Sequence, residues 1–204
     1  MTSFNKYLCQ SAEDGKADAQ FQLGLCYFQG LGIATNFTEA VVWFEKAAEQ
    51  GHTSAQINLA SLYTSGKGVE QNLELAFRWY REAAKQGGDI EQEMLGGLYS
   101  RGQGVRQDKM EAAKWYRMSA DQGFCIAQRK LAECYMNGEG VPKDEIEAYA
   151  YFNLAAIQCE VSRTKLAQLE EYLPMSARLA GQQRSRQMRK DIDAHWAKKK
   201  KEPK

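Results

Sequence analysis

The sequence repeats itself every 36 residues, and this period constrains the fold more than any other feature. Counting from Gly15, a glycine returns at Gly51, Gly87 and Gly123, and Cys159 takes the next place. Each unit also carries a leucine, a tyrosine, two glycines separated by one residue and an aromatic residue at fixed places. Periods of about 20 to 50 residues are typical of solenoid proteins, in which each unit packs mainly on its neighbours. The sequence therefore predicts four repeats, 15–50, 51–86, 87–122 and 123–158.

Each repeat contains the signals of two helices joined by a turn. In the first half the leucine, a small residue and the tyrosine stand 8, 9 and 12 residues after the first glycine, on one helix face. The paired glycines supply a helix end and a turn that needs positive φ. The second helix is expected to begin after an N-cap residue, which is Asn36, Asn72, Asp108 or Asp144. A glutamate three residues later in repeats one, three and four indicates a capping box.

The residues outside the repeats predict helical caps. Residues 1–14 match the second helix of a repeat and are expected to form an N-terminal capping helix. Residues 159–197 read as a C-terminal cap of two helices, and residues 198–204 read as a disordered basic tail. The leucines expected to cover the last repeat are Leu166, Leu169, Leu173 and Leu179. The expected fold class is an all-α solenoid of four helix-turn-helix repeats with helical caps.

Charge and hydropathy exclude several classes of partner. The chain has 27 Lys plus Arg and 26 Asp plus Glu, so its formal charge of +1 gives no overall attraction to nucleic acid or anionic membranes. No apolar run approaches the roughly 18 residues of a membrane span. The basic run 184–204 is interpreted as a solvated cap face, with nucleic-acid or anionic-lipid contact as the minor alternative. We expect a cytoplasmic protein if Met1 is the native start, and a periplasmic or secreted one if a signal peptide was removed.

The sequence offers no residue cluster for metal binding. His52 is expected in an exposed turn and His195 near the charged C-terminus, and neither has a partner at ligand spacing. No C-x-x-C spacing occurs, so the cysteines are interpreted as small buried hydrophobes. They are Cys9, Cys26, Cys125, Cys134 and Cys159. We expect no metal and no cofactor.

One string has a catalytic spacing. Residues 162–165, Ser-Arg-Thr-Lys, form the S-x-x-K of β-lactam-binding enzymes, but the partner motifs S-D-N and K-T-G are absent. Ser162 also stands where a cap helix is expected to start, and serine is a good N-cap. The N-cap interpretation is preferred, and the sequence predicts no catalytic residue and no enzyme.

The repeat resembles the Sel-one-like repeat family, whose members are relatives of the tetratricopeptide repeats. The matching pattern is A-x-x-x-L-G-x-x-Y-x-x-G-x-G-V-x-x-D-x-x-x-A-x-x-W. Residues 131–151, LAECYMNGEGVPKDEIEAYAY, follow it, with Ala132 for the glycine and Tyr151 for the tryptophan. The resemblance covers about residues 1–158. It implies a right-handed α-α superhelix with a concave face. It also implies an adaptor role, since such proteins mostly hold other proteins together in signalling, membrane-complex quality control, cell-envelope biology and bacterial virulence.

By analogy with tetratricopeptide stacks, the first helices line a concave groove. The places expected to point into it vary between repeats while the signature stays constant, as expected when scaffold and binding surface are separated. The expected partner-binding residues are Phe21, Leu25, Phe28, Gln29, Ile57, Ser61, Thr64, Ser65, Glu93, Ser100, Arg101, Arg129, Glu133, Met136 and Asn137. We hypothesise that the groove takes an extended or helical peptide anchored by Phe21, Leu25 and Phe28. The alternative is that these three side chains only pack against the N-terminal helix.

The resulting functional hypothesis is a non-enzymatic, monomeric scaffold that binds a partner protein or peptide. One alternative is a secreted or periplasmic cell-envelope or virulence factor that binds a small ligand or cell-wall fragment. A more remote alternative is a β-lactam-binding or β-lactamase-like enzyme acting through Ser162.

Overall fold

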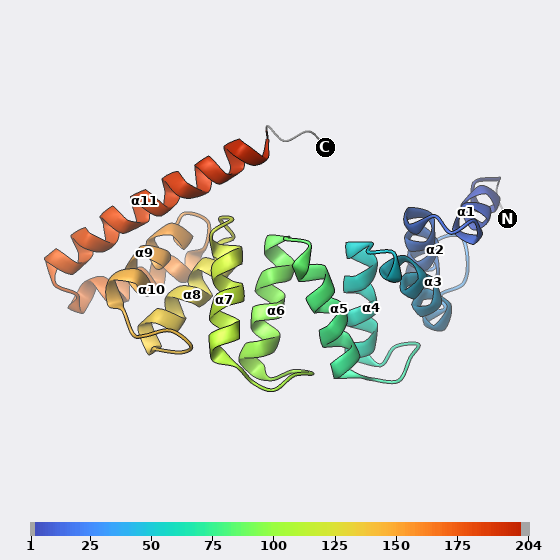
Figure 1. Ribbon diagram of the computed structural model, residues 1–204, viewed down its shortest axis with the longest axis horizontal. Helices are drawn as coiled ribbons and strands as arrows, with labels where there is room; N and C mark the ends of the chain where they lie inside the picture. Colours follow the sequence, from blue (N-terminus) through green and yellow to red (C-terminus); the bar gives the residue numbers. More distant parts are fainter. Residues whose placement is uncertain (1–2, 201–204) are drawn as a thin grey trace. The chain divides into compact units, whose positions relative to one another are not determined.

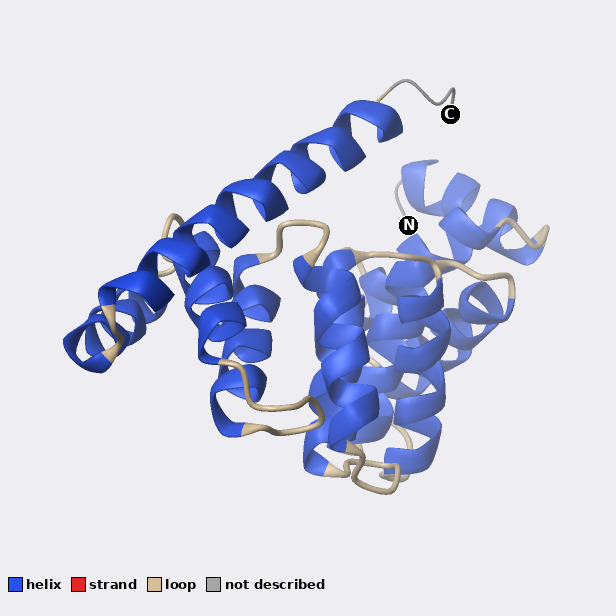
Figure 2. Cartoon of the chain, turned by 60° about the vertical axis from the view of Figure 1, so that its left-hand side comes forward, coloured by secondary structure: helices blue, strands red, loops and turns tan. Residues whose placement is uncertain are grey.

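The chain is helical throughout the part that the structure describes. The computed structural model describes residues 3–200, which form eleven α-helices and contain no strand (Figures 1 and 2). The helices are α1 (Ser3–Glu13), α2 (Ala17–Gln29), α3 (Phe37–Glu49), α4 (Thr53–Ser65), α5 (Leu73–Lys85), α6 (Asp89–Arg101), α7 (Lys109–Ala120), α8 (Cys125–Asn137), α9 (Glu145–Ala155), α10 (Glu160–Tyr172) and α11 (Met175–Lys199). The predicted all-α chain is confirmed. The pairs α2–α3, α4–α5, α6–α7 and α8–α9 are the first and second helices of the four repeats.

The helices form two compact units. Unit 1 contains α1 to α5 and the loop 102–106, and unit 2 contains α6 to α11. The core of unit 1 is built around Phe44 and Leu59, both fully buried, with alanines of α3, α4 and α5. The core of unit 2 is built around Leu131 and Phe152, with alanines of α7, α8 and α9. Small residues at the helix contacts allow close approach of the aromatic and leucine side chains.

The second helices begin as predicted, but the capping box does not form. Asp108 accepts backbone hydrogen bonds from Met110 (2.9 Å) and Glu111 (3.0 Å) at the start of α7. Its own N–H donates to the carbonyl oxygen of Tyr99 (3.0 Å), so the reciprocal bond expected from Glu111 is replaced. The same bond, from the N-cap N–H to the repeat tyrosine, occurs in all four repeats. The glutamate can then pair elsewhere, as Glu111 does with Lys114.

The two glycines of each turn have different roles. Gly138 (φ 71°) ends α8, and an added Cβ there would meet Lys143 at an ordinary 3.5 Å. Gly140 (φ 73°) approaches the preceding repeat, and an added Cβ would lie 1.9 Å from the carbonyl oxygen of Lys109, the first residue of α7. Gly68 makes the same approach to Phe37, and Gly104 to Leu73. The second glycine is therefore a contact between repeats as well as a positive-φ position.

A buried glutamine that the sequence analysis missed connects successive helices. Gln56, 4% exposed, donates to the Ala48 carbonyl oxygen (3.1 Å) and accepts from the Gln86 side chain (2.9 Å). Gln20 donates in the same way to the carbonyl oxygen of Ala12 in α1 (3.2 Å). Helix α1 therefore lies against α2 as α3 lies against α4. The signal was in the sequence, because a glutamine recurs five residues after the first glycine of each repeat, at Gln20, Gln56, Gln92 and Gln128.

Helix α11 packs along α9 through small residues (Figure 1). Its buried face contains Gly181 and Ser185, and an added Cβ at Gly181 would lie 2.5 Å from the Tyr149 ring. The prediction that Leu179 covers the last repeat is wrong, because this side chain is 51% exposed. Leu169 of α10, by contrast, is buried. Helix α11 continues through the first two residues of the predicted tail, and residues 201–204 lie outside the described part.

Candidate functional site

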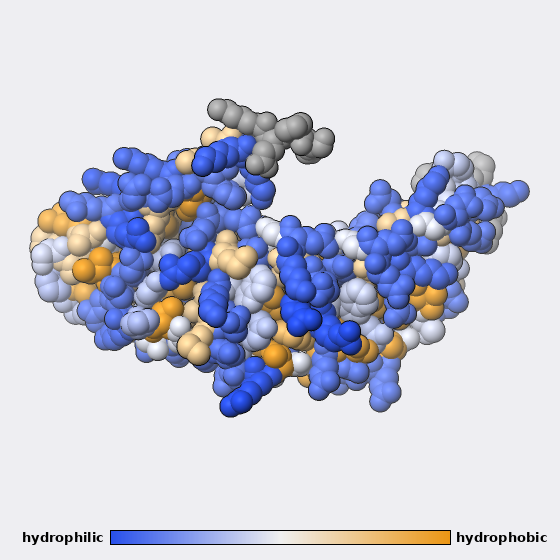
Figure 3. Space-filling model, viewed as in Figure 1, coloured by the Kyte–Doolittle hydropathy of each residue, from blue (hydrophilic) through white to orange (hydrophobic). Residues whose placement is uncertain are grey.

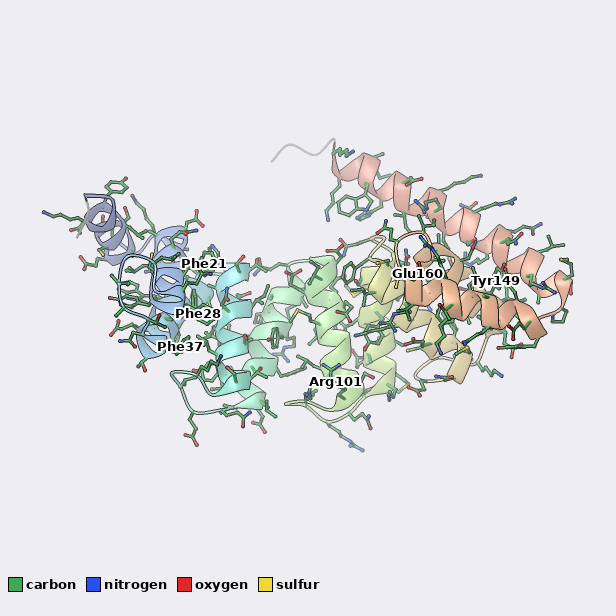
Figure 4. All side chains as sticks on the ribbon, turned by 180° about the vertical axis from the view of Figure 1, so that it is seen from behind. Phe21, Phe28, Phe37, Arg101, Tyr149 and Glu160 are labelled. Atoms are coloured by element: carbon green, nitrogen blue, oxygen red, sulfur yellow. The ribbon has the colours of Figure 1, made fainter. Side chains whose placement is uncertain are left out.

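The first helices of unit 1 carry an aromatic cluster that is partly buried. Phe28 packs edge-on against Phe37 (5.6 Å between ring centroids) and lies 6.3 Å from Phe44 (Figure 4). Phe21 lies 5.8 Å from Phe44, and Leu25 packs on the same core. The ring partners of Phe21 and Phe28 among the described side chains therefore belong to the repeats themselves. The surface of unit 1 therefore contains a half-buried apolar strip, formed by Phe21, Leu25 and Phe28.

His52 is not the exposed turn residue that the sequence suggested. Its ring stacks on Phe21 (4.4 Å between centroids), and its Nδ1 accepts from the Ala55 N–H (3.2 Å) as the N-cap of α4. Its Nε2 lies 3.4 Å from the Asp18 carboxylate. The imidazole accepts a hydrogen bond from a backbone N–H in the first turn of α4, and this bond holds the ring against the helix.

The polar first-helix residues of unit 1 lie beside this strip. Gln29, Ser61, Thr64 and Ser65 are all exposed, whereas Ile57 is half-buried. Thr64 and Ser65 donate their hydroxyl hydrogens to carbonyl oxygens of their own helix, at 2.8 and 2.9 Å. These two hydroxyls can therefore offer a partner mainly their acceptor lone pairs.

In unit 2 the first helices present paired charges. Arg129 and Glu133 form an ion pair along α8 (2.8 Å), and Lys130 of α8 pairs with Glu93 of α6. Glu93 and Lys130 keep only 12% and 25% of their side chains exposed. Lys130 was not among the expected binding residues. The 36-residue period relates Glu93 to Arg129, and Lys130 is the next residue in the chain.

The remaining expected residues of unit 2 frame these pairs. Ser100 and Met136 are half-buried, Asn137 is exposed, and Arg101 is exposed at the end of α6 (Figure 4). Ser100 accepts from Lys109 Nζ (3.3 Å). The structure thus places every expected residue on a first helix, eight in unit 1 and seven in unit 2.

The comparisons with known proteins identify the repeat. The Sel1 repeat family model matches residues 17–52, 53–88, 92–124 and 125–158. The chain belongs to the Sel1 repeat family. The matches cover all four helix pairs, so the predicted solenoid of four Sel-one-like repeats is confirmed.

Two solved Sel1 structures are similar to the chain. A Sel1 repeat protein from Oxalobacter formigenes is 38% identical with a TM-score of 0.72, and the match covers 79% of this chain and 67% of that one. A protective antigen of uropathogenic Escherichia coli strains with an SLR fold is 30% identical with a TM-score of 0.58. That match covers 97% of this chain but 51% of the antigen, so the chain spans about half of the antigen's length. No curated protein matches the chain.

Sel1 repeat proteins generally mediate protein–protein interaction and are typically non-catalytic. Within residues 3–200 no group of three or more His, Cys, Asp or Glu side chains could hold a metal ion. The same residues contain no helix long and apolar enough to cross a membrane. The cysteines are free and half-buried.

Ser162 is not the N-cap of α10. Cys159 has that position, and Ser162 lies in the first turn with no exposed surface. Helix α10 starts earlier than predicted, with Glu160 as its first residue, where a carboxylate favours the helix dipole. A buried hydroxyl cannot reach a β-lactam carbonyl, so the geometry opposes the β-lactam alternative.

Proposed function

We propose that this Sel1 repeat protein is a non-enzymatic scaffold that binds a partner protein or peptide on its first-helix surfaces. Four repeats supply the surface, with α1 as N-terminal cap and α10 and α11 as C-terminal cap. One observation carries the proposal. The leucine and the small residue that recur on the first helices, such as Leu59 and Ala60, are buried in all four repeats, whereas the expected partner-binding residues on α2, α4, α6 and α8 remain partly or fully exposed. Such a division is expected when scaffold and recognition are separate tasks.

The two units offer different chemistry to a partner. Unit 1 presents the half-buried strip of Phe21, Leu25 and Phe28 beside neutral polar residues. Unit 2 presents the two ion pairs, whose charges already satisfy one another. A helical or extended segment with an apolar anchor matches the surface of unit 1, and a segment with neutral polar side chains matches the surface of unit 2. The rest of the exposed surface drawn in Figure 3 is mostly hydrophilic, with hydrophobic residues scattered across it.

The test must spare the aromatic cluster, because truncating Phe21 or Phe28 would also remove packing against Phe44. We suggest Ser61→Arg with Asn137→Arg, two exposed first-helix residues, one in each unit. The matched control is Val42→Arg with Met118→Arg, exposed on the second helices. Partners captured by the native chain should be lost from the first variant and kept by the second. Loss from both, or from neither, would show that the first helices are not the binding surface.

A further inference from the structure

A polar cavity lies in unit 2, away from the first-helix surfaces. It has a volume of about 380 Å³, is open to solvent, and is lined by residues of α7, α9 and α11 and by Asp121. Pockets of roughly 300 to 1,000 Å³ are the usual size for small ligands. Its apolar floor is formed by Tyr151, Leu154 and Met188, each less than 10% exposed.

The cationic end of the cavity is formed by two arginines. The Arg117 guanidinium donates to the Tyr135 hydroxyl and lies over the Tyr135 ring (5.5 Å). Arg184 donates from Nε to Glu147 (2.7 Å). Each of these bonds uses one N–H of a guanidinium that has five, so both groups retain donors for a ligand.

The anionic end lies one to two helical turns further on. Asp121, the C-cap residue of α7, follows Arg117 by four residues, and Asp191 follows Arg184 by seven on α11, which corresponds to about 6 and 10 Å of helix rise. The Trp196 indole near the end of α11 donates to the Gln122 carbonyl oxygen just beyond α7 (2.8 Å), so the end of α11 lies beside the end of α7. Asp121 and Asp191 are close enough for the charge of Asp191 to raise the pKa of the Asp121 carboxyl.

The Asp121 carboxylate is not paired within the described residues. It forms no hydrogen bond or ion pair there, and although the residue is exposed, desolvation by the surrounding protein raises the pKa of its carboxyl. Arg117, Arg184 and His195 pull the pKa of this carboxyl in the opposite direction, and Asp191 adds to the rise. A cationic group of a ligand that reaches this carboxylate would form a favourable charge pair with it.

The repeat pattern does not require these charges. The places of Arg117 and Asp121 hold Glu45 and Glu49 in the first repeat, Arg81 and Lys85 in the second, and Asn153 and Ile157 in the fourth. An arginine followed by an aspartate at these places therefore occurs in the third repeat alone, next to α11.

We infer that this cavity binds a short zwitterionic peptide, with its carboxylate at Arg117 and Arg184 and its ammonium group at Asp121 and Asp191. Two aspartates repel a simple anion and two arginines repel a simple cation, so a ligand with both charges fits best. An extended chain spans about 3.3 to 3.6 Å per residue, so two or three residues bridge the two ends. His195, a further lining residue, is exposed, as Asp121 is.

The experiment is a calorimetric titration of the full chain with triglycine, compared with N-acetyl-triglycine amide, which lacks both terminal charges. Triglycine should bind saturably and the blocked peptide should not. Absence of triglycine binding, or equal binding of the two peptides, overturns the proposal and leaves a solvent-filled gap beneath α11.

Variants locate the binding. Asp121→Asn and Arg184→Gln should each weaken triglycine binding at least about tenfold, or about 1.4 kcal/mol. The controls Asp193→Asn and Arg186→Gln change exposed residues of α11 outside the cavity and should stay within about twofold. Equal effects of cavity and control variants would refute the site. If Arg184→Gln disturbs the fold by releasing Glu147, Asp121→Asn decides alone. The first-helix variant should bind triglycine normally, so failure of the scaffold proposal would be seen separately.

Discussion

Gly140 and Gly138 stand two residues apart in one turn and should differ greatly in their tolerance of alanine. Both have φ near +70°, so either substitution strains the backbone by about 1 to 2 kcal/mol. The smaller entropy of the unfolded chain offsets about 0.4 to 1 kcal/mol of this. We therefore expect Gly138→Ala to cost about 1 kcal/mol in unfolding free energy.

Gly140→Ala adds a collision with the preceding repeat. Its Cβ would lie 1.9 Å from the Lys109 carbonyl oxygen and 2.8 Å from the Met110 nitrogen, both backbone atoms that no side-chain rotation can move. The turn and the start of α7 must separate, which typically costs a further 1 to 3 kcal/mol, or about 2 here. The ion pair between Lys109 and Glu139 (2.9 Å) would be disturbed as well, but two half-exposed side chains contribute little.

The assay is urea unfolding followed by circular dichroism, with hydrogen exchange at the amides of α7 as the local reading. Repeat proteins need not unfold in two states, so the local reading is the more direct one. Gly140→Ala should speed exchange in α7, and Gly138→Ala should leave it nearly unchanged. Similar losses in the two variants would refute a close contact between repeats at the second glycine.

Four further predictions rest on single groups. Asp108→Ala removes both cap bonds of α7 and should lower the unfolding free energy by about 1 kcal/mol in urea, whereas Asp108→Asn should cost less. Burial raises the pKa of Tyr116 to about 12, and an unfolded tyrosine ionises near pH 10, so stability should fall as pH rises between these values. Thermal melts at alkaline pH should show a smaller fall in Tyr116→Phe. Burial also raises the pKa of the Cys134 thiol to about 11, so mass spectrometry should find it alkylated more slowly at neutral pH than Cys159, whose pKa is lowered by the adjoining Ser162. Asp121→Asn should raise the melting temperature slightly at pH 7, because desolvation disfavours the native carboxylate. That gain should shrink as pH falls through the raised native pKa of Asp121.

The helix boundaries could be predicted because their signals are local. An N-cap such as Asp108 acts on N–H groups two and three residues away, and a glycine such as Gly138 ends its own helix. Ser162 shows the limit of such reasoning. Serine is the better N-cap by preference, yet α10 begins after Cys159 and Ser162 is buried in its first turn. The preference of serine for the N-cap position therefore did not decide where α10 begins.

Contacts between repeats can be predicted from the sequence when two residues about 36 places apart are compared for complementary charge. Glu93 and Lys130 are 37 residues apart, one place from the 36-residue step, so the register could have suggested their ion pair. The cavity beneath α11 could not be found in this way. Helix α11 lies outside the repeats, and its packing face contains Gly181 and Ser185, where a search for hydrophobic residues selects Leu179 instead.

The repeated and the varying residues differ in what they contribute to stability. Repeated residues such as Gln56 and Gly140 form contacts that recur along the chain, and each of these contacts favours the fold. Asp121 differs from them, because its carboxyl has no hydrogen bond or ion pair within the described residues, and desolvation raises its pKa although Arg117, Arg184 and His195 act to lower it. A charged group that has no such partner and breaks the repeat is expected at a binding site, where a ligand supplies the missing interaction. The cavity differs in this respect from the first-helix surface of unit 2, whose charges are already paired. The cavity is therefore where a small charged ligand should gain most.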